Sequence, residues 1–131
     1  MEQKNKLIVE FLELEPCDRC VNYGGFYCSP HGQPTSSHSI INTPSEMKYH
    51  LWWDWLMPVV EKIESIYHED HGYFGVYISS NGCTIQGTKF RPDAKVVKVY
   101  YDNVVLSTKI ESTYECVIRF IKWYLKNIKN K

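Results

Sequence analysis

Three cysteines and a histidine stand close together near the start of the chain: Cys17, Cys20, Cys28 and His31. Two residues separate the members of each close pair, a spacing at which two side chains bind one metal ion. Three thiolates and an imidazole suit tetrahedral zinc, and four protein ligands would make the site structural. The alternative is a hairpin whose cysteines fill small apolar spaces, because the gap of seven residues between the pairs is short for paired zinc knuckles. Zinc is therefore the one cofactor that the sequence puts forward.

Two further groups of residues carry side chains that can do chemistry. His68 and His71 share one helix face and can bind one metal, although histidines before a glycine are ordinary residues of a helix C-terminus. Cys83 and Cys116 are expected to be buried thiols, and a Cys–His pair assembled only in the folded chain stays open. No stretch resembles a nucleophile elbow, a P-loop or a dinucleotide fingerprint. A non-enzymatic protein is therefore the preferred interpretation, and an enzyme without a recognisable motif stays open.

The charge of the chain is balanced, with 15 basic and 15 acidic residues. A neutral chain is a poor candidate for non-specific nucleic-acid binding, which depends on Lys and Arg neutralising phosphates. The C-terminal end is locally basic, with Trp123 and Tyr124 as neighbouring groups on which a base could stack. A solvated helix end explains these lysines equally well, and nucleic acid is not the expected partner. They are Lys122, Lys126, Lys129 and Lys131.

No apolar run approaches the ~20 residues that span a bilayer, and Glu10 and Glu13 interrupt the apolar N-terminal stretch, which excludes a signal-peptide core. We expect a protein of the bacterial host cytoplasm that contacts no membrane and keeps its five cysteines reduced. A chain of 131 residues fits one domain, residues 1–131, and buries enough surface to fold without a metal. Residues 17–42 form its cysteine-containing hairpin and loop.

The tryptophan-rich stretch predicts a long helix. Thr43 and Glu46 form a capping box around Pro44, and Gly72 closes the helix at its C-terminus. Pro58 removes one hydrogen bond, so a kink or a break just before it is expected. Trp53 and Met57 lie at the edge of the apolar face. The core face of this helix comprises Trp52, Trp55, Leu56, Val59, Val60, Ile63, Ile66 and Tyr67.

A hairpin follows, with strands at 73–80 and 83–90 around Asn81-Gly82, the favoured pair for a type I′ turn. That turn places Ile78 opposite Ile85 and Val76 opposite Gly87. A third strand is expected at 95–101, and residues 104–106 are a candidate fourth strand.

Thr108 and Glu111 form a second capping box, before a C-terminal helix with two apolar stripes. The main stripe comprises Ile110, Tyr114, Val117, Ile118, Ile121, Leu125 and Ile128. The second comprises Cys116, Phe120 and Trp123. Either this helix lies between the sheet and another helix, which is the preferred interpretation, or Phe120 and Trp123 face a partner. Trp53 and Met57 are comparable interface candidates, because Trp and Met are frequent at binding surfaces.

Together these elements predict an α+β fold. A small antiparallel sheet of three to four strands is packed by the tryptophan-rich helix and the C-terminal helix, with a short N-terminal helix at residues 4–14.

Two blocks of the sequence, KYHLWWDWLMPVVEKIES and KIESTYECVIRFIKWYLKN, carry a resemblance. The first is similar to a YHxSWDWLMPVVEKIE-like block, and the second to a KIEAxYxAxVxFIKWYN-like helix. Both belong to a group of small uncharacterised proteins of Bacteroidetes and of their phages and mobile elements. The chain departs from that pattern at Leu51 and Trp52, where small polar residues are expected. The resemblance implies origin and a role as an accessory gene, and it supplies no catalytic residues.

The function expected from the sequence is that of a non-enzymatic accessory protein, related to phages or mobile elements, which acts by protein binding or self-association. The excess of aromatic residues and the absence of catalytic motifs carry this expectation. One alternative is a zinc-stabilised nucleic-acid-binding module. Another is a binder of small molecules or nucleotides, or an enzyme, that has no recognisable motif.

Overall fold

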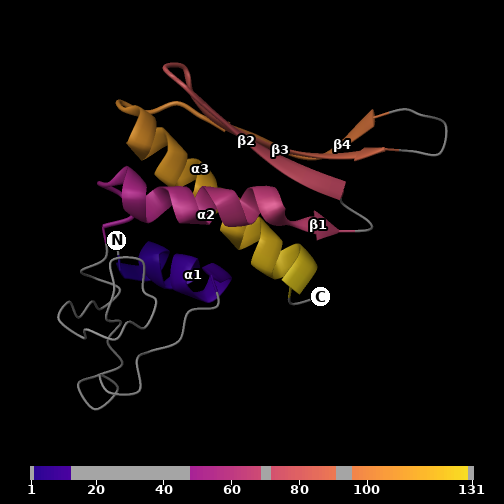
Figure 1. The fold of residues 1–131 in the computed structure, drawn as a ribbon, viewed down its shortest axis with the longest axis horizontal. Coiled ribbons are helices and arrows are strands. Elements are labelled where there is room, and N and C mark those ends of the chain that lie inside the picture. The colour runs from indigo at the N-terminus through magenta and orange to yellow at the C-terminus, as the bar shows by residue number, and fades with distance from the viewer. Residues whose placement is uncertain (1, 13–47, 69–71, 91–95, 130–131) are drawn as a thin grey trace, which may run out of the picture.

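The computed structural model describes residues 2–12, 48–68, 72–90 and 96–129 (Figure 1). The fold is α+β, as the sequence predicts: an antiparallel sheet packed by two helices, with a short N-terminal helix. The elements in chain order are α1 (Glu2–Leu12), α2 (Trp53–Ser65), β1 (Tyr67–His68), β2 (Gly72–Ser79), β3 (Gly82–Phe90), β4 (Val96–Val104), α3 (Lys109–Tyr124) and a π-helical turn, η3 (Leu125–Lys129).

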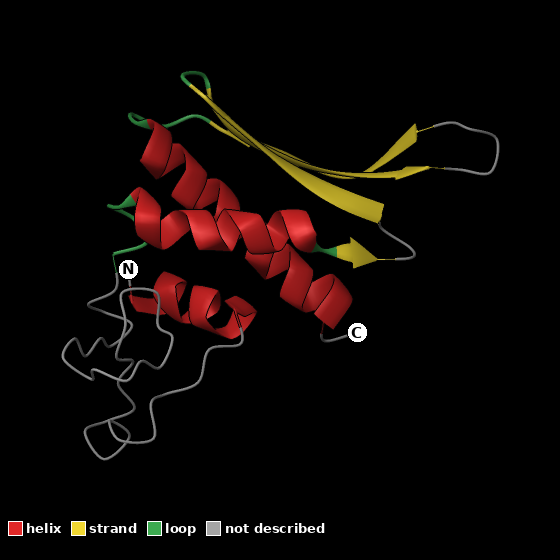
Figure 2. Ribbon diagram, in the orientation of Figure 1, coloured by secondary structure: helices red, strands yellow, loops and turns green. Residues whose placement is uncertain are grey.

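The sheet has the order β1-β2-β3-β4, and every neighbouring pair is antiparallel. Three of its strands are long, and β1 adds two residues at one edge. All the helices lie on one side of it (Figure 2). Helix α2 packs mainly on β2, α3 packs on β3 and β4, and α1 packs against α3 and α2 from the side away from the sheet. The described elements share one hydrophobic core.

Helix α3 is the central element of this arrangement, and its capping box begins it where the sequence predicts. Thr108 is the N-cap, and its hydroxyl accepts a hydrogen bond from the Glu111 backbone N–H at 3.2 Å. The preferred interpretation of its second stripe is also confirmed, because Cys116 and Phe120 are fully buried. The ring of Phe120 meets Phe74 of the sheet on one side and Phe11 of α1 on the other.

The predicted start of the tryptophan-rich helix was wrong. The Thr43–Glu46 capping box lies outside the described residues, but α2 begins only at Trp53, after a turn in which the N–H groups of Leu51 and Trp52 bond to Lys48. Tyr49 explains the turn: it is fully buried and packs edge-on against Trp55 at 5.2 Å. Trp52 is the extended N-cap and is 55% exposed, so its assignment to the core face was wrong as well.

The predicted end of this helix was also wrong. Helix α2 ends at Ser65, and the cap residue Ile66 is extended. Tyr67 then enters β1 and pairs with Tyr73, with the two ring centroids 4.7 Å apart. Gly72 belongs to β2 and does not cap a helix. His68 lies in β1, outside any helix.

Helix α2 continues through Pro58, so the predicted break before it is excluded, and the alternative of a kink stays a prediction. The cost of one lost hydrogen bond is offset because the core face of the helix is buried along its length. Its buried residues are Trp55, Leu56, Val59, Val60 and Ile63.

The hairpin is present with a register two residues away from the predicted one. Ser79 pairs with Gly82, so Ser80 and Asn81 form the turn, and Val76 lies opposite Ile85. Gly82 follows the turn with φ of 109°, a conformation that L side chains rarely adopt. A shift of two residues leaves every side chain on its predicted face. The separate strand at 104–106 was wrong, because β4 is one continuous strand from Val96 to Val104.

Candidate functional site

The outer face of the sheet carries four tyrosines: Tyr67, Tyr73, Tyr77 and Tyr101. Each is more than half exposed. Strand register places them together, since Tyr67 pairs with Tyr73 and Tyr101 pairs with Gln86, which in turn lies opposite Gly75. In the part of the chain that the structure describes, no helix covers this face (Figure 2). We call it the tyrosine face.

Tyr77 lies along the tyrosine face instead of standing away from it. A Cβ atom placed on Gly75 would meet the Tyr77 hydroxyl at 2.9 Å and the ring carbons at 3.1 Å. The hydroxyl end of the ring therefore rests over Gly75, and more than half of the side chain stays open to solvent. Glycine makes this position of the ring available because it has no side chain of its own.

The groups between the tyrosines are neutral and polar. Thr84 donates a hydrogen bond to the Asn103 side chain at 2.8 Å, and Gln86 lies between Gly75 and Tyr101. Lys98 is the one charged side chain among the described residues of this face, and its ammonium lies 5.0 Å from the centre of the Tyr101 ring. The alternation of residues along 73–77 is the sequence signal for this surface, which was not among the predicted sites.

A second exposed surface lies at the start of α2. It consists of Leu51, Trp52, Trp53 and Met57, and we call it the tryptophan surface. Leu51 and Trp52 are more than half exposed, while Trp53 and Met57 are each exposed by more than a third. Trp53 and Met57 share one helix face because they are four residues apart. The sequence analysis named these two residues as interface candidates.

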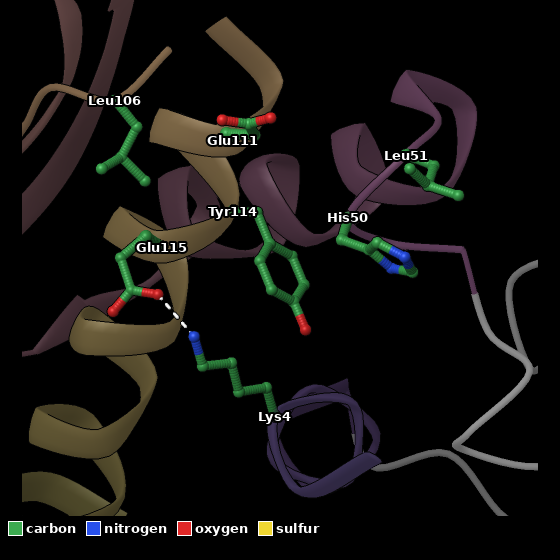
Figure 3. A pocket seen from close by; sticks show the side chains of 7 residues that line it. All are labelled: Lys4, His50, Leu51, Leu106, Glu111, Tyr114 and Glu115. Carbon is green, nitrogen blue, oxygen red and sulfur yellow. Dashed lines mark hydrogen bonds and ion pairs between the residues drawn. The ribbon is translucent and has the colours of Figure 1, made fainter. Parts of the chain in front are cut away.

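A pocket of about 280 Å³ lies where the start of α1, the turn before α2 and the start of α3 meet (Figure 3). Three segments far apart in the sequence form it, so its composition could not be read from motifs. Its lining residues are Lys4, His50, Leu51, Leu106, Glu111, Tyr114 and Glu115.

The ionisable groups of this pocket are held by neighbours. Burial alone would raise the pKa of Glu115, but the Lys4 ammonium at 2.8 Å, with Arg119, holds it below its ordinary value. Burial, and then the charges of Lys48 and the N-terminus, lower the pKa of His50, whose ring is therefore neutral near pH 7. Burial raises the pKa of Tyr114 to about 12, and its hydroxyl donates a hydrogen bond to Asn5 at 3.0 Å.

Two polar groups of the pocket take part in bonds between α1 and α3. Among the residues that the structure describes, the pocket lining contains no Ser, Thr or Cys. The Tyr114 proton is bound in a hydrogen bond, and the Glu115 carboxylate is bound to Lys4. The Lys4–Glu115 ion pair and the Tyr114–Asn5 hydrogen bond therefore join α1 to α3.

Cys83 and Cys116 are both fully buried, which confirms the prediction of buried thiols. Their mutual interaction lowers the pKa of Cys83 and, together with burial, raises that of Cys116. Cys116 also donates to the Asp102 carbonyl at 3.9 Å. Neither thiol reaches solvent, so neither is placed to attack a substrate.

The four residues of the sequence-predicted zinc site, Cys17, Cys20, Cys28 and His31, lie outside the described residues, and that site stays a prediction. His71 also lies outside them. Among the residues that the structure describes, no three His, Cys, Asp or Glu side chains come together as a candidate metal site.

The interface candidate Phe120 was wrong, because this residue is fully buried at the centre of the aromatic core. Trp123 is half-buried, with its ring 4.6 Å from that of Tyr100, and it borders this core. Two of the four interface candidates, Trp53 and Met57, therefore keep a substantial exposed surface.

Comparison of the chain with protein-family models, with curated proteins and with solved structures finds no match. Within the described ranges, no helix combines the length and the apolar character that crossing a bilayer requires.

Proposed function

We propose that the protein is a non-enzymatic accessory protein that binds another protein through its tryptophan surface. Exposure of Trp52 and Trp53 is the observation that supports this proposal most directly. Tryptophan is the residue type most enriched at binding hot spots, and Leu51 and Met57 extend the apolar area around it. The balanced net charge of the chain agrees with a role in protein binding.

The resemblance of the sequence to proteins of Bacteroidetes phages and mobile elements gives the proposal its setting. In that setting the protein acts in the cytoplasm of a bacterial host cell, and its partner is a host or phage protein. Self-association through the same surface is the second form of the proposal, because exposed tryptophans on two copies can pack together as readily as on two different proteins.

The position of the tryptophans allows variants that preserve the fold. Trp52 is the N-cap of α2 and makes no side-chain capping bond, and Ser is a preferred N-cap residue. Trp53 is the first residue of α2, where the helix dipole favours an acidic side chain. The double variant Trp52→Ser/Trp53→Glu therefore removes the apolar surface while favouring the start of the helix.

The experiment compares the wild type, this double variant and Tyr67→Ser, a matched loss of one exposed aromatic residue elsewhere. Proteins that co-purify from phage-infected host cells are quantified for all three, and sedimentation velocity measures self-association. A partner, or a dimer, that the double variant loses and Tyr67→Ser retains supports the proposal. Equal retention by all three proteins refutes it.

A further inference from the structure

The residues of the tyrosine face take no part in the proposed protein binding by the tryptophan surface. In the described part of the chain it presents four tyrosines, a set of neutral hydrogen-bonding groups and one lysine, with no carboxylate. Asp102 is the acidic residue of β4. Its side chain lies on the helix side of the sheet and pairs with Arg119 at 3.5 Å. The acids of α2 and α3 also lie behind the sheet.

From this arrangement we propose that the tyrosine face binds single-stranded nucleic acid. The rings of Tyr77 and Tyr101 would stack with two unpaired bases. Lys98 would contact a phosphate beside Tyr101. This inference is independent of the proposed protein-binding function, because it uses the opposite side of the molecule.

The position of the Tyr77 ring favours stacking. The ring lies along the strand with its hydroxyl end beside Gly75, and it is more than half exposed, so a base can reach it from solvent. Gly75 and Tyr101 are separated by one strand, which puts the two stacking positions ~10 Å apart. Bases this far apart cannot stack on each other, so an unpaired and splayed strand fits the face while a duplex does not.

The groups between the two rings suit the edges of the bases. Gln86 lies between Gly75 and Tyr101, and its amide both donates and accepts hydrogen bonds. Thr84 and Asn103, which bond each other beside Tyr77, offer the same combination. An aromatic sheet face with helices behind it is a common way to bind single strands.

The charge of Lys98 favours nucleic acid over a second copy of the chain as the molecule bound to this face. Two copies packed face to face would bring Lys98 against a surface that has no described carboxylate, so a buried ammonium would lack a partner. A phosphate supplies that partner. The balanced net charge of the chain excludes affinity driven by many phosphate contacts, but stacking does not depend on net charge.

The test is fluorescence anisotropy of labelled oligothymidylate and oligouridylate, with a labelled duplex as the comparison. We expect the single strands to bind and the duplex to bind at least tenfold more weakly. Because Lys98 is the one described cation on this face, log K should fall with log salt concentration with a slope of only about −0.7, the value for one phosphate. A slope several times steeper would place binding at the lysines of α3 and overturn the proposal.

Single-residue variants test whether single-stranded nucleic acid binds at the tyrosine face. Tyr77→Ser should weaken single-strand binding between about 5-fold and 150-fold, the loss of one stacked base, and Tyr77→Phe should retain it. Gly75→Ala keeps the tyrosine but displaces its ring, and should weaken binding as well. Trp52→Ser, on the helix side, is the control and should bind normally.

Circular dichroism checks that each variant is folded, which is expected because Tyr77 is exposed. Absence of single-strand binding by the wild type overturns the proposal and leaves the protein-binding function unaffected. Equal binding by Tyr77→Ser also overturns it. A wild-type dimer that Tyr77→Ser dissociates, without nucleic-acid binding, would assign the face to a second copy instead.

Discussion

The ring of Phe74 lies over Gly87 on the neighbouring strand, so close that a Cβ atom on residue 87 would come within 2.7 Å of a ring carbon. The two residues are direct cross-strand partners, and the Phe74 ring reaches Phe120 of α3 at 5.1 Å. Gly87 thus lets the sheet and the helices share one aromatic core.

The first prediction concerns this pair. Gly87→Ala should destabilise the fold by about 1–3 kcal/mol, because the added methyl group must displace the Phe74 ring from a closely packed position. Urea unfolding monitored by tryptophan fluorescence measures the loss. A second change, Phe74→Leu, should recover part of it in the Gly87→Ala protein. A Gly87→Ala protein as stable as the wild type would show that the core adapts there without cost.

The second prediction separates core from interface. Phe120→Ala should cost about 3–5 kcal/mol, as for other buried phenylalanines, since Phe120 contacts both the sheet and α1. This is a large part of the ~5–15 kcal/mol that stabilises a domain of this size. Trp52→Ser should leave stability within about 0.5 kcal/mol. Thermal melts of both variants provide the measurement, and equal melting temperatures would contradict the buried position of Phe120.

The outcome for Phe120 shows what the sequence could predict. A helix with two apolar stripes must cover both, and the sequence analysis preferred burial between the sheet and another helix. What the sequence could not settle was whether Phe120 would stay exposed, because that depends on where Phe11 of α1 packs, and Phe11 lies more than 100 residues before Phe120 in the chain. The capping of α3 by Thr108 was predictable because it depends only on local residues.

The errors occur where tertiary contacts override local patterns. Tyr49 packs into the core and delays the start of α2, so Trp52 leaves the core face that its spacing predicted. The conformation of Gly82 moves the turn by one residue, which the Asn-Gly pair alone did not reveal. The pocket around His50 could not be predicted at all, since its three segments meet only in the folded chain.

The third prediction concerns the ion pair between Lys4 and Glu115, which joins α1 to α3 (Figure 3). The pKa of Glu115 is lowered in the folded protein, so its contribution is present above the ordinary glutamate pKa and is lost as pH falls through the folded value. Lys4→Met should therefore destabilise the protein at about pH 7 and much less at about pH 3. The cost should be no more than about 1 kcal/mol, because the lysine side chain is 40% exposed.

Urea titrations of the wild type and Lys4→Met at both pH values test this. Lys122→Met on α3 is the matched control, because Lys122 is exposed and does not line the pocket. A Lys4→Met cost that does not change with pH would mean that lost packing, and not the charge on Glu115, explains the effect.

The fourth prediction concerns His50. Its pKa is lowered in the folded protein, so the unfolded chain binds a proton more readily and stability falls as pH drops below about 6.5. His50→Gln should remove this part of the pH dependence. The NMR titration of the His50 ring gives the pKa directly, and an inflection at or above about 6.5 would contradict the predicted direction.

Site-specific photocrosslinking in infected host cells tests whether the tryptophan surface binds a protein. A photoreactive phenylalanine analogue replaces Trp53, and in a matched protein it replaces Lys122, an exposed residue of α3. We expect a discrete covalent adduct from position 53 that is absent from position 122 and is lost when Trp52→Ser is added. The same pattern of adducts from both positions, or none from position 53, would contradict it.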